Sequence, residues 1–82
     1  MRVSVIVPTL NEETHILHTI QSLQRLRGEK EIIIVDGGSD DQTVPLASAQ
    51  PVRVIQAPQG RGSQMHAGAL AAKGDVLWFV HA

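Results

Sequence analysis

The chain has 82 residues, of which 43% are hydrophobic, so it can form one small folded domain and is too apolar for a disordered segment. Its formal net charge is −1 and it has no run of like charges, which argues against a nucleic-acid partner. It has no cysteine, so disulfides and thiolate metal sites are excluded. No apolar run reaches the length of a signal-peptide core or a membrane span. We therefore expect a cytoplasmic protein, with membrane association through a C-terminal extension left open.

Four short apolar runs rich in Val and Ile alternate with three helical patterns. Most of these runs are continuously apolar, as expected of parallel strands that helices cover on both faces. The predicted strands are Val3–Val7, Ile32–Val35, Val52–Ile55 and Val76–Val80. The third run is the least apolar, so we place it at an edge of the sheet. Trp78 lies in the middle of the fourth run and is predicted to be a core residue.

The first helix is predicted to begin at Asn11, a good N-cap residue, and to end at Gly28. Two glutamates follow Asn11 and suit the positive end of a helix dipole. Apolar residues then recur at helical spacing and predict one buried stripe, formed by Ile16, Ile20, Leu23 and Leu26.

The second helix is predicted to open near Asp40, where Pro45 is tolerable because it lies near the first turn. The third is predicted to run from Gly62 to Gly74, with alanines and glycines that let it approach the sheet closely. Strands that alternate with helices imply right-handed crossovers and an α/β sandwich. We predict a mostly parallel four-stranded sheet of order 3-2-1-4. Because the pattern ends on a strand, we expect residues 1–82 to be one incomplete domain.

Polar and glycine residues gather in the segments that follow the predicted strands. In open α/β sheets these segments share one edge, and ligands bind there, near the point where the strand order reverses. The segments are Pro8–Glu12, Asp36–Asp41, Gln59–Gln64 and His81. We therefore expect all four to face one crevice.

The residue types in this crevice suit a nucleotide, but each also has a purely structural interpretation. Asp36 can accept a hydrogen bond from a base or a ribose, or can cap the turn at Gly37. Thr9 can bond a base edge or only its own turn. Arg61 follows Gly60 and can reach a phosphate or a base carbonyl, or can be solvated. The residues alone leave these alternatives open.

Two further residues are equally ambiguous. Glu12 stands at a predicted helix start, where an acidic residue is expected for dipole reasons alone. His81 follows the fourth strand beside the predicted reversal of strand order, where it can be a ligand or a hydrogen-bonded edge histidine.

Four segments resemble, in this order and spacing, the motifs of family 2 glycosyltransferases, which have the GT-A fold. Val3–Glu13 resembles the opening strand and turn, and Glu31–Asp41 resembles the motif V-D-D-G-S-x-D. Gly60–Ala69 is similar to the third motif, and Gly74–Val80 is similar to the strand that leads to the D-x-D metal site. The resemblance covers the whole chain and implies a Rossmann-like half of a GT-A domain.

The resemblance implies that this part of the enzyme binds a nucleotide-sugar donor, with a UDP-sugar as the commonest donor. Asp36 would bind the base, Thr9 and Arg61 would assist, and Glu12 would lie on the nucleoside side. The implied nucleotide-binding set is Pro8, Thr9, Leu10, Glu12, Asp36, Gly37, Gly60 and Arg61. The full-length enzyme would transfer the sugar to an acceptor hydroxyl with inversion, and the sugar and the acceptor are left open.

Three residues depart from the family pattern. Gly37 stands where a second Asp is common, and His66 stands where an Asn is common. His81 stands at the first Asp of D-x-D, with Ala82 as the middle residue and no second Asp after it. The resemblance implies a divalent ion, Mg²⁺ or Mn²⁺, that holds the donor diphosphate. His81 is the candidate metal ligand, but we expect these residues alone neither to hold the ion nor to transfer sugar.

Other functions remain as alternatives. A nicotinamide-binding oxidoreductase should have G-x-G-x-x-G in its first turn, and Pro8–Glu13 lacks it. A nucleotidyltransferase should have a glycine-rich basic first loop, which is also missing. A non-catalytic nucleotide-binding or structural fragment stays open. Because the apolar fourth strand would lie at an uncovered edge, we also expect self-association through it.

Overall fold

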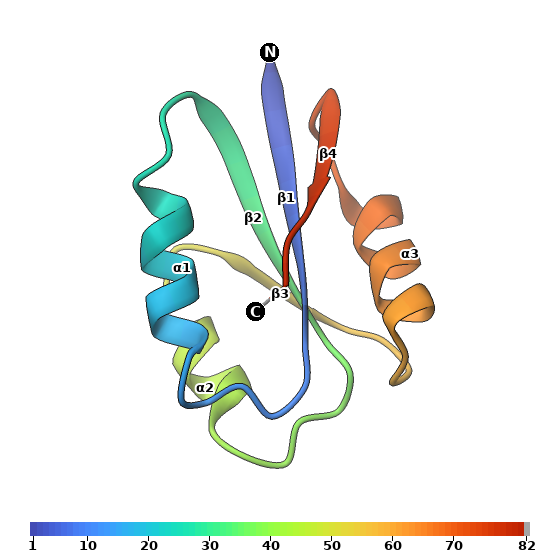
Figure 1. Ribbon diagram of the computed structural model, residues 1–82. Coiled ribbons are helices and arrows are strands. Elements are labelled where there is room, and N and C mark those ends of the chain that lie inside the picture. Colours follow the sequence, from blue (N-terminus) through green and yellow to red (C-terminus); the bar gives the residue numbers. More distant parts are fainter. Residues whose placement is uncertain (82) are drawn as a thin grey trace.

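The computed structural model describes residues 1–81, and Ala82 lies outside the described residues. Strands and helices alternate along the chain, as predicted (Figure 1). The elements are β1 (Arg2–Thr9), α1 (Ile16–Gln24), β2 (Glu29–Asp36), α2 (Thr43–Ser48), β3 (Arg53–Gln56), α3 (Arg61–Ala71) and β4 (Val76–Phe79). Within the described residues no helix is long and apolar enough to cross a membrane.

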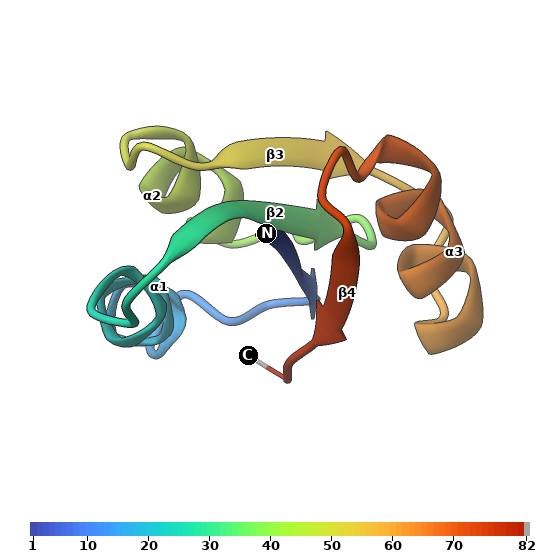
Figure 2. The same cartoon turned by 90° about the horizontal axis from the view of Figure 1, so that it is seen from above.

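The four strands form one sheet of order β3-β2-β1-β4, in which all neighbours are parallel. The predicted strand order is thus confirmed. Helices α1 and α2 lie on one side of the sheet and α3 lies on the other (Figure 2). The register of β1 and β2 pairs Arg2 with Glu29 and Thr9 with Asp36, so these two strands end side by side.

The core sits on β1 and β2, which helices cover on both faces. Alternate apolar side chains of these strands face in opposite directions, as a period of two requires. One set packs against α1 and α2 and contains Val5, Val7, Ile32 and Ile34. The other set packs toward α3 and contains Ile6, Ile33 and Val35. A Cβ added at Gly68 of α3 would overlap the side chain of Ile6, so this helix approaches the sheet as closely as predicted.

Helix α1 begins at Ile16, so the predicted start at Asn11 is wrong. Asn11 has a φ of 51°, in the left-handed region that a right-handed helix excludes. Its side chain and backbone bond to the loop after β2 instead of capping a helix. Ile16, Ile20 and Leu23 form the buried stripe, but Leu26 lies beyond the helix end and is 41% exposed.

The start of α2 also differs from the prediction. This helix begins at Thr43 rather than near Asp40. The carboxylate of Asp41 accepts hydrogen bonds from the backbone nitrogen of Thr43 at 2.9 Å and from its hydroxyl at 2.5 Å. These bonds, with those from the neighbouring loop, lower the pKa of Asp41 against the effect of desolvation.

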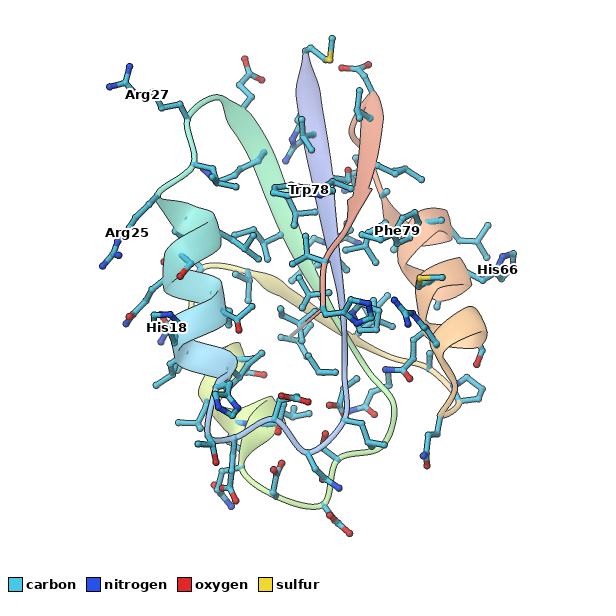
Figure 3. The ribbon with its side chains drawn as sticks, in the orientation of Figure 1. His18, Arg25, Arg27, His66, Trp78 and Phe79 are labelled. Carbon is cyan, nitrogen blue, oxygen red and sulfur yellow. The ribbon has the colours of Figure 1, made fainter. Side chains whose placement is uncertain are left out.

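Strand β4 differs most from the expected core strand. Trp78 is 45% exposed rather than buried, and its neighbours in the strand are exposed to a similar degree. Trp78 and Phe79 point to opposite sides of the strand (Figure 3). The reason is positional: β4 is an edge strand, and α3 packs over β1 and β2 rather than over β4.

Candidate functional site

The segments that follow the strands meet at one edge of the sheet. Thr9 ends β1 and Asp36 ends β2, and the two are register partners. Arg61 begins α3 after a short loop from β3, and His81 follows β4. The chain leaves β1 toward β2 on one side, whereas β4 lies on the other side, so the strand order reverses at β1. This is the position at which α/β sheets bind ligands.

Asp36 is fully buried and its carboxylate is saturated with hydrogen bonds. Oδ1 accepts from the hydroxyls of Thr9 at 3.0 Å and Ser39 at 2.6 Å. Oδ2 accepts from the backbone nitrogens of Gly38 at 3.0 Å and Ser39 at 2.7 Å. Burial raises the pKa of Asp36, but the hydrogen bonds from Ser39, Thr9 and Gly38 outweigh it and hold the pKa below its ordinary value. The site therefore contains a preformed negative charge.

A polar network joins the loop after β1 to the loop after β2. The backbone nitrogen of Asn11 donates to the Ser39 hydroxyl at 2.8 Å, and that of Asp40 donates to Asn11 Oδ1 at 3.0 Å. The backbone nitrogen of Glu12 donates to the Thr43 hydroxyl at 2.8 Å. These bonds satisfy donors that would otherwise begin a helix, which explains why the sequence pattern misplaced the start of α1.

Gln64 of α3 lies between three segments of the site, and no role for it was predicted from its sequence position. Its side chain is buried. Nε2 donates to the backbone oxygens of Thr9 and Val35, each at 2.9 Å, and Oε1 accepts from the backbone nitrogen of Gly60 at 3.1 Å. Its local sequence carries no signal of these partners, which come from separate segments of the chain.

Arg61 and His81 form a second group at the same edge. Nη2 of Arg61 contacts Nε2 of His81. The guanidinium of Arg61 carries only donors. Both side chains border a small cavity of about 20 Å³, lined by Pro8, Arg61, Met65, Phe79, Val80 and His81.

The model for glycosyl transferase family 2 matches residues 4–82. The chain belongs to glycosyltransferase family 2. Its strand order and three helices are those of its GT-A structural neighbours, so the fold that the motifs implied is confirmed.

This family 2 chain is similar to several longer proteins. An uncharacterized glycosyltransferase of Mycobacterium tuberculosis is 38% identical, over 96% of this chain and 32% of that protein. The crystal structure of glucosyl-3-phosphoglycerate synthase from M. tuberculosis with Mn²⁺, UDP and glucosyl-3-phosphoglycerate has a TM-score of 0.87 at 31% identity, covering 98% of this chain and 33% of that one. TarS 1–349 of S. aureus in complex with UDP has a TM-score of 0.85 at 30% identity, covering 99% and 27%. The chain thus spans about a third of the length of such relatives.

Metal-ligating side chains do not cluster in the described part of this glycosyltransferase chain. Within residues 1–81 no group of three or more His, Cys, Asp and Glu side chains is arranged to hold a metal ion. Nε2 of His81, the predicted metal ligand, is in contact with the guanidinium of Arg61.

The structure places the sequence-predicted residues in two groups. Thr9, Asp36 and Gly37 lie together at the ends of β1 and β2, where the backbone nitrogen of Gly37 donates to the Thr9 oxygen at 2.9 Å. Pro8, Arg61 and His81 lie at the end of β4.

Three other residues complete the placement. Gly60 is joined to the first group through Gln64. Leu10 and Glu12 are half-buried on the loop after β1. His66, which departs from the family pattern, is exposed on α3 and points away from the sheet (Figure 3).

Proposed function

We propose that this chain is the donor-binding part of a longer glycosyltransferase and that the donor is a UDP-sugar. The observation that carries the proposal is the edge of the sheet at which the strand order reverses, where a buried, ionised Asp36 ends β2 and the Arg61 guanidinium lies beside His81 after β4. The UDP in the structures of two family relatives supports the choice of nucleotide.

The two groups of residues suit the two parts of a nucleoside diphosphate. Asp36 accepts only, and two of its four donors are hydroxyls, which can rotate away in favour of a base N–H or a ribose hydroxyl. Arg61 offers several donors and a permanent charge, which suit a diphosphate. Recognition of the base by Asp36 would therefore exchange one internal hydroxyl donor for a ligand donor, with the charge kept in place.

The remaining steps belong, in this proposal, to the whole enzyme. We expect a divalent ion, Mg²⁺ or Mn²⁺, in the full-length protein, and the Mn²⁺ reported with UDP in the synthase structure supports this. When bound, such an ion would neutralise charge on the leaving diphosphate. Inverting transfer to an acceptor hydroxyl needs a base that none of these residues is predicted to supply. We therefore expect residues 1–82 to bind the donor and to transfer no sugar.

NMR titration of the 15N-labelled chain tests donor binding. UDP, GDP and NAD are added in parallel, with and without Mn²⁺. We expect UDP to shift the amide resonances of Gly37, Gly38 and Gly60. Shifts with NAD and with neither nucleoside diphosphate would overturn the proposal, and no shift with any nucleotide would favour a purely structural fragment.

We also propose that the isolated chain self-associates by pairing β4 with β4 of a second copy. Val76, Leu77, Trp78 and Phe79 are each 41–45% exposed, and β4 is an edge of the sheet. An exposed apolar edge strand is a template for pairing with another chain. Light scattering should show oligomers that Trp78→Lys disrupts and Leu70→Lys, which changes an exposed leucine of α3, does not. A monomeric wild-type chain would contradict the proposal.

A further inference from the structure

Gln64 joins the parts of the proposed donor site that lie farthest apart in sequence. It stands in the first turns of α3, yet its amide reaches the last backbone carbonyls of β1 and β2 and the loop before its own helix. All three bonds are buried or half-buried, and the side chain is 4% exposed. A buried amide that makes three well-formed hydrogen bonds is held in one orientation.

We propose that Gln64 is a positioning residue of the donor site and that position 37 is a glycine because the Gln64 amide occupies the space of its side chain. The inference rests on the proposed donor-binding function and deepens it. Gln64 touches no substrate in this scheme. It acts by holding Thr9 and Gly60, and through them Asp36 and Arg61, at a set separation.

The requirement for glycine at position 37 comes from packing and not from backbone conformation. Gly37 is not among the glycines with positive φ, which are Gly28, Gly38 and Gly60. A Cβ at Gly37 would lie 2.8 Å from Oε1, 2.9 Å from Cδ and 3.0 Å from Nε2 of Gln64. Such contacts are closer than van der Waals packing allows. The amide could move away only by breaking its hydrogen bonds to the strand ends and to Gly60.

The Thr9 backbone oxygen shows how the effect reaches the site. It accepts from Gln64 Nε2 and from the Gly37 backbone nitrogen, each at 2.9 Å. The Thr9 hydroxyl in turn donates to Asp36 at 3.0 Å. At the other end of the amide, Gly60 is the residue immediately before Arg61. One side chain thus links the acceptor that we assign to the nucleoside with the cation that we assign to the diphosphate.

A double-mutant cycle on thermal unfolding tests the packing half of the proposal. We expect Gly37→Ala to lower the Tm in the wild-type background and to have little effect in a Gln64→Ala background, because the space is then open. Gly62→Ala is the matched control, since nothing lies within 4 Å of a Cβ built there. An equal loss of Tm from Gly37→Ala in both backgrounds would show that Gln64 does not set the residue at position 37.

UDP affinity tests the positioning half. Gln64→Met keeps the length of the side chain but removes all three hydrogen bonds, and we expect UDP to bind about tenfold more weakly. Gln21→Met changes an exposed glutamine of α1, away from this network, and should leave affinity unchanged. Ile20→Val, in the core cluster on the other face, lowers the Tm without touching this network and controls for stability. If the methionine variant does not fold, Gln64→Glu replaces it in this test. It keeps the acceptor for Gly60 but loses the donor to Thr9 and Val35.

The two proposals fail in different ways. If the wild-type chain binds UDP and Gln64→Met loses no more affinity than Ile20→Val, the positioning role is wrong and the donor site stands. If the wild-type chain binds no nucleoside diphosphate, the proposed donor site is wrong. The positioning role of Gln64 is then tested by amide hydrogen exchange on the free protein. Faster exchange at Gly60 and Gly37 in Gln64→Met would then support the positioning role, and unchanged exchange would overturn it.

Discussion

Strand β2 buries a carboxylate at each of its ends, and the two carboxylates differ in their partners. Glu31, at the amino end, accepts from the Ser4 hydroxyl at 2.5 Å, from the Lys73 backbone nitrogen at 2.5 Å and from Arg53 at 3.2 Å. Asp36, at the carboxyl end, accepts only from neutral donors, of which those of Ser39 lie three residues away. Both groups have lowered pKa values, and that of Glu31 is lowered to about 2.

The difference separates an end of the sheet that stabilises the fold from the end at which we propose that the donor binds. The partners of Glu31 come from β1, β3 and the α3–β4 connection, so this carboxylate ties together segments far apart in sequence. Arg53 also binds the Ala71 oxygen at 2.8 Å, and the Ser4 hydroxyl accepts from Gly74 at 2.8 Å. Asp36 instead organises one loop, with hydroxyl donors that a ligand can replace.

The largest expected effect is that of Glu31→Gln on stability. The substitution removes the charge that pairs with Arg53 and replaces one acceptor oxygen with an NH2 donor, which must face the donors of Ser4 and Lys73 or that of Arg53. We expect the free energy of unfolding to fall by about 3 kcal/mol, since a buried polar group left facing donors costs up to this much. The ion pair itself adds little, because the Arg53 side chain is 40% exposed. Urea denaturation measures the loss. The control is Glu29→Gln, at an exposed position of the same strand, which should change the free energy of unfolding little. A loss no greater than that of Glu29→Gln would contradict the assigned role.

The second largest effect is the dependence of stability on pH, which should come from the Glu31 end of β2. Glu31 has a folded pKa of about 2 against an ordinary 4.5, so its contribution is present above pH 4.5 and is lost as the pH falls toward 2. Desolvation opposes this shift, and the bonds from Ser4, Lys73 and Arg53 outweigh it. Thermal unfolding between pH 7 and 2 should show a steep loss of Tm in the wild type and a flatter one in Glu31→Gln. Identical slopes would show that Glu31 is not the group that titrates.

At the other end, Asp36→Asn should weaken UDP binding and also lower stability. An amide would point donors at the hydroxyls and backbone nitrogens that now donate to the carboxylate. We expect a loss of about 1–3 kcal/mol of stability and about tenfold in UDP affinity. Asp40→Asn, at an exposed position of the same loop, is the control. Normal UDP binding by Asp36→Asn would reduce Asp36 to a turn residue.

The smallest expected effects come from deleting one hydroxyl at each end. Ser4→Ala and Thr9→Val each remove one hydrogen bond to a buried carboxylate and should cost about 1 kcal/mol of stability. Only Thr9→Val should also weaken UDP binding, because Ser4 lies at the far end of the sheet. Calorimetric titration of each variant with UDP measures this contrast. Equal UDP affinities would contradict the prediction that only the Thr9 end binds the donor.

The sheet and the place of the candidate site were predictable from the sequence. Continuous apolarity in Val3–Val7 and Ile32–Val35 requires burial on both faces, and the alternation with helices leaves few topologies. The strand order followed from that, as did the adjacency of Thr9 and Asp36, because parallel strands end at the same edge. Four motifs in order identified the family.

The polar groups that meet across these segments could be identified only from the tertiary structure. Local capping rules place a helix start at Asn11, but bonds to Ser39 and Asp40 from another loop outcompete them. The apolarity of Trp78 predicts burial, but burial depends on what packs against an edge strand, and α3 lies elsewhere. Gln64 and Glu31 carry no local signal of their partners, since hydrogen bonds between residues far apart in sequence depend on the packed arrangement of whole elements.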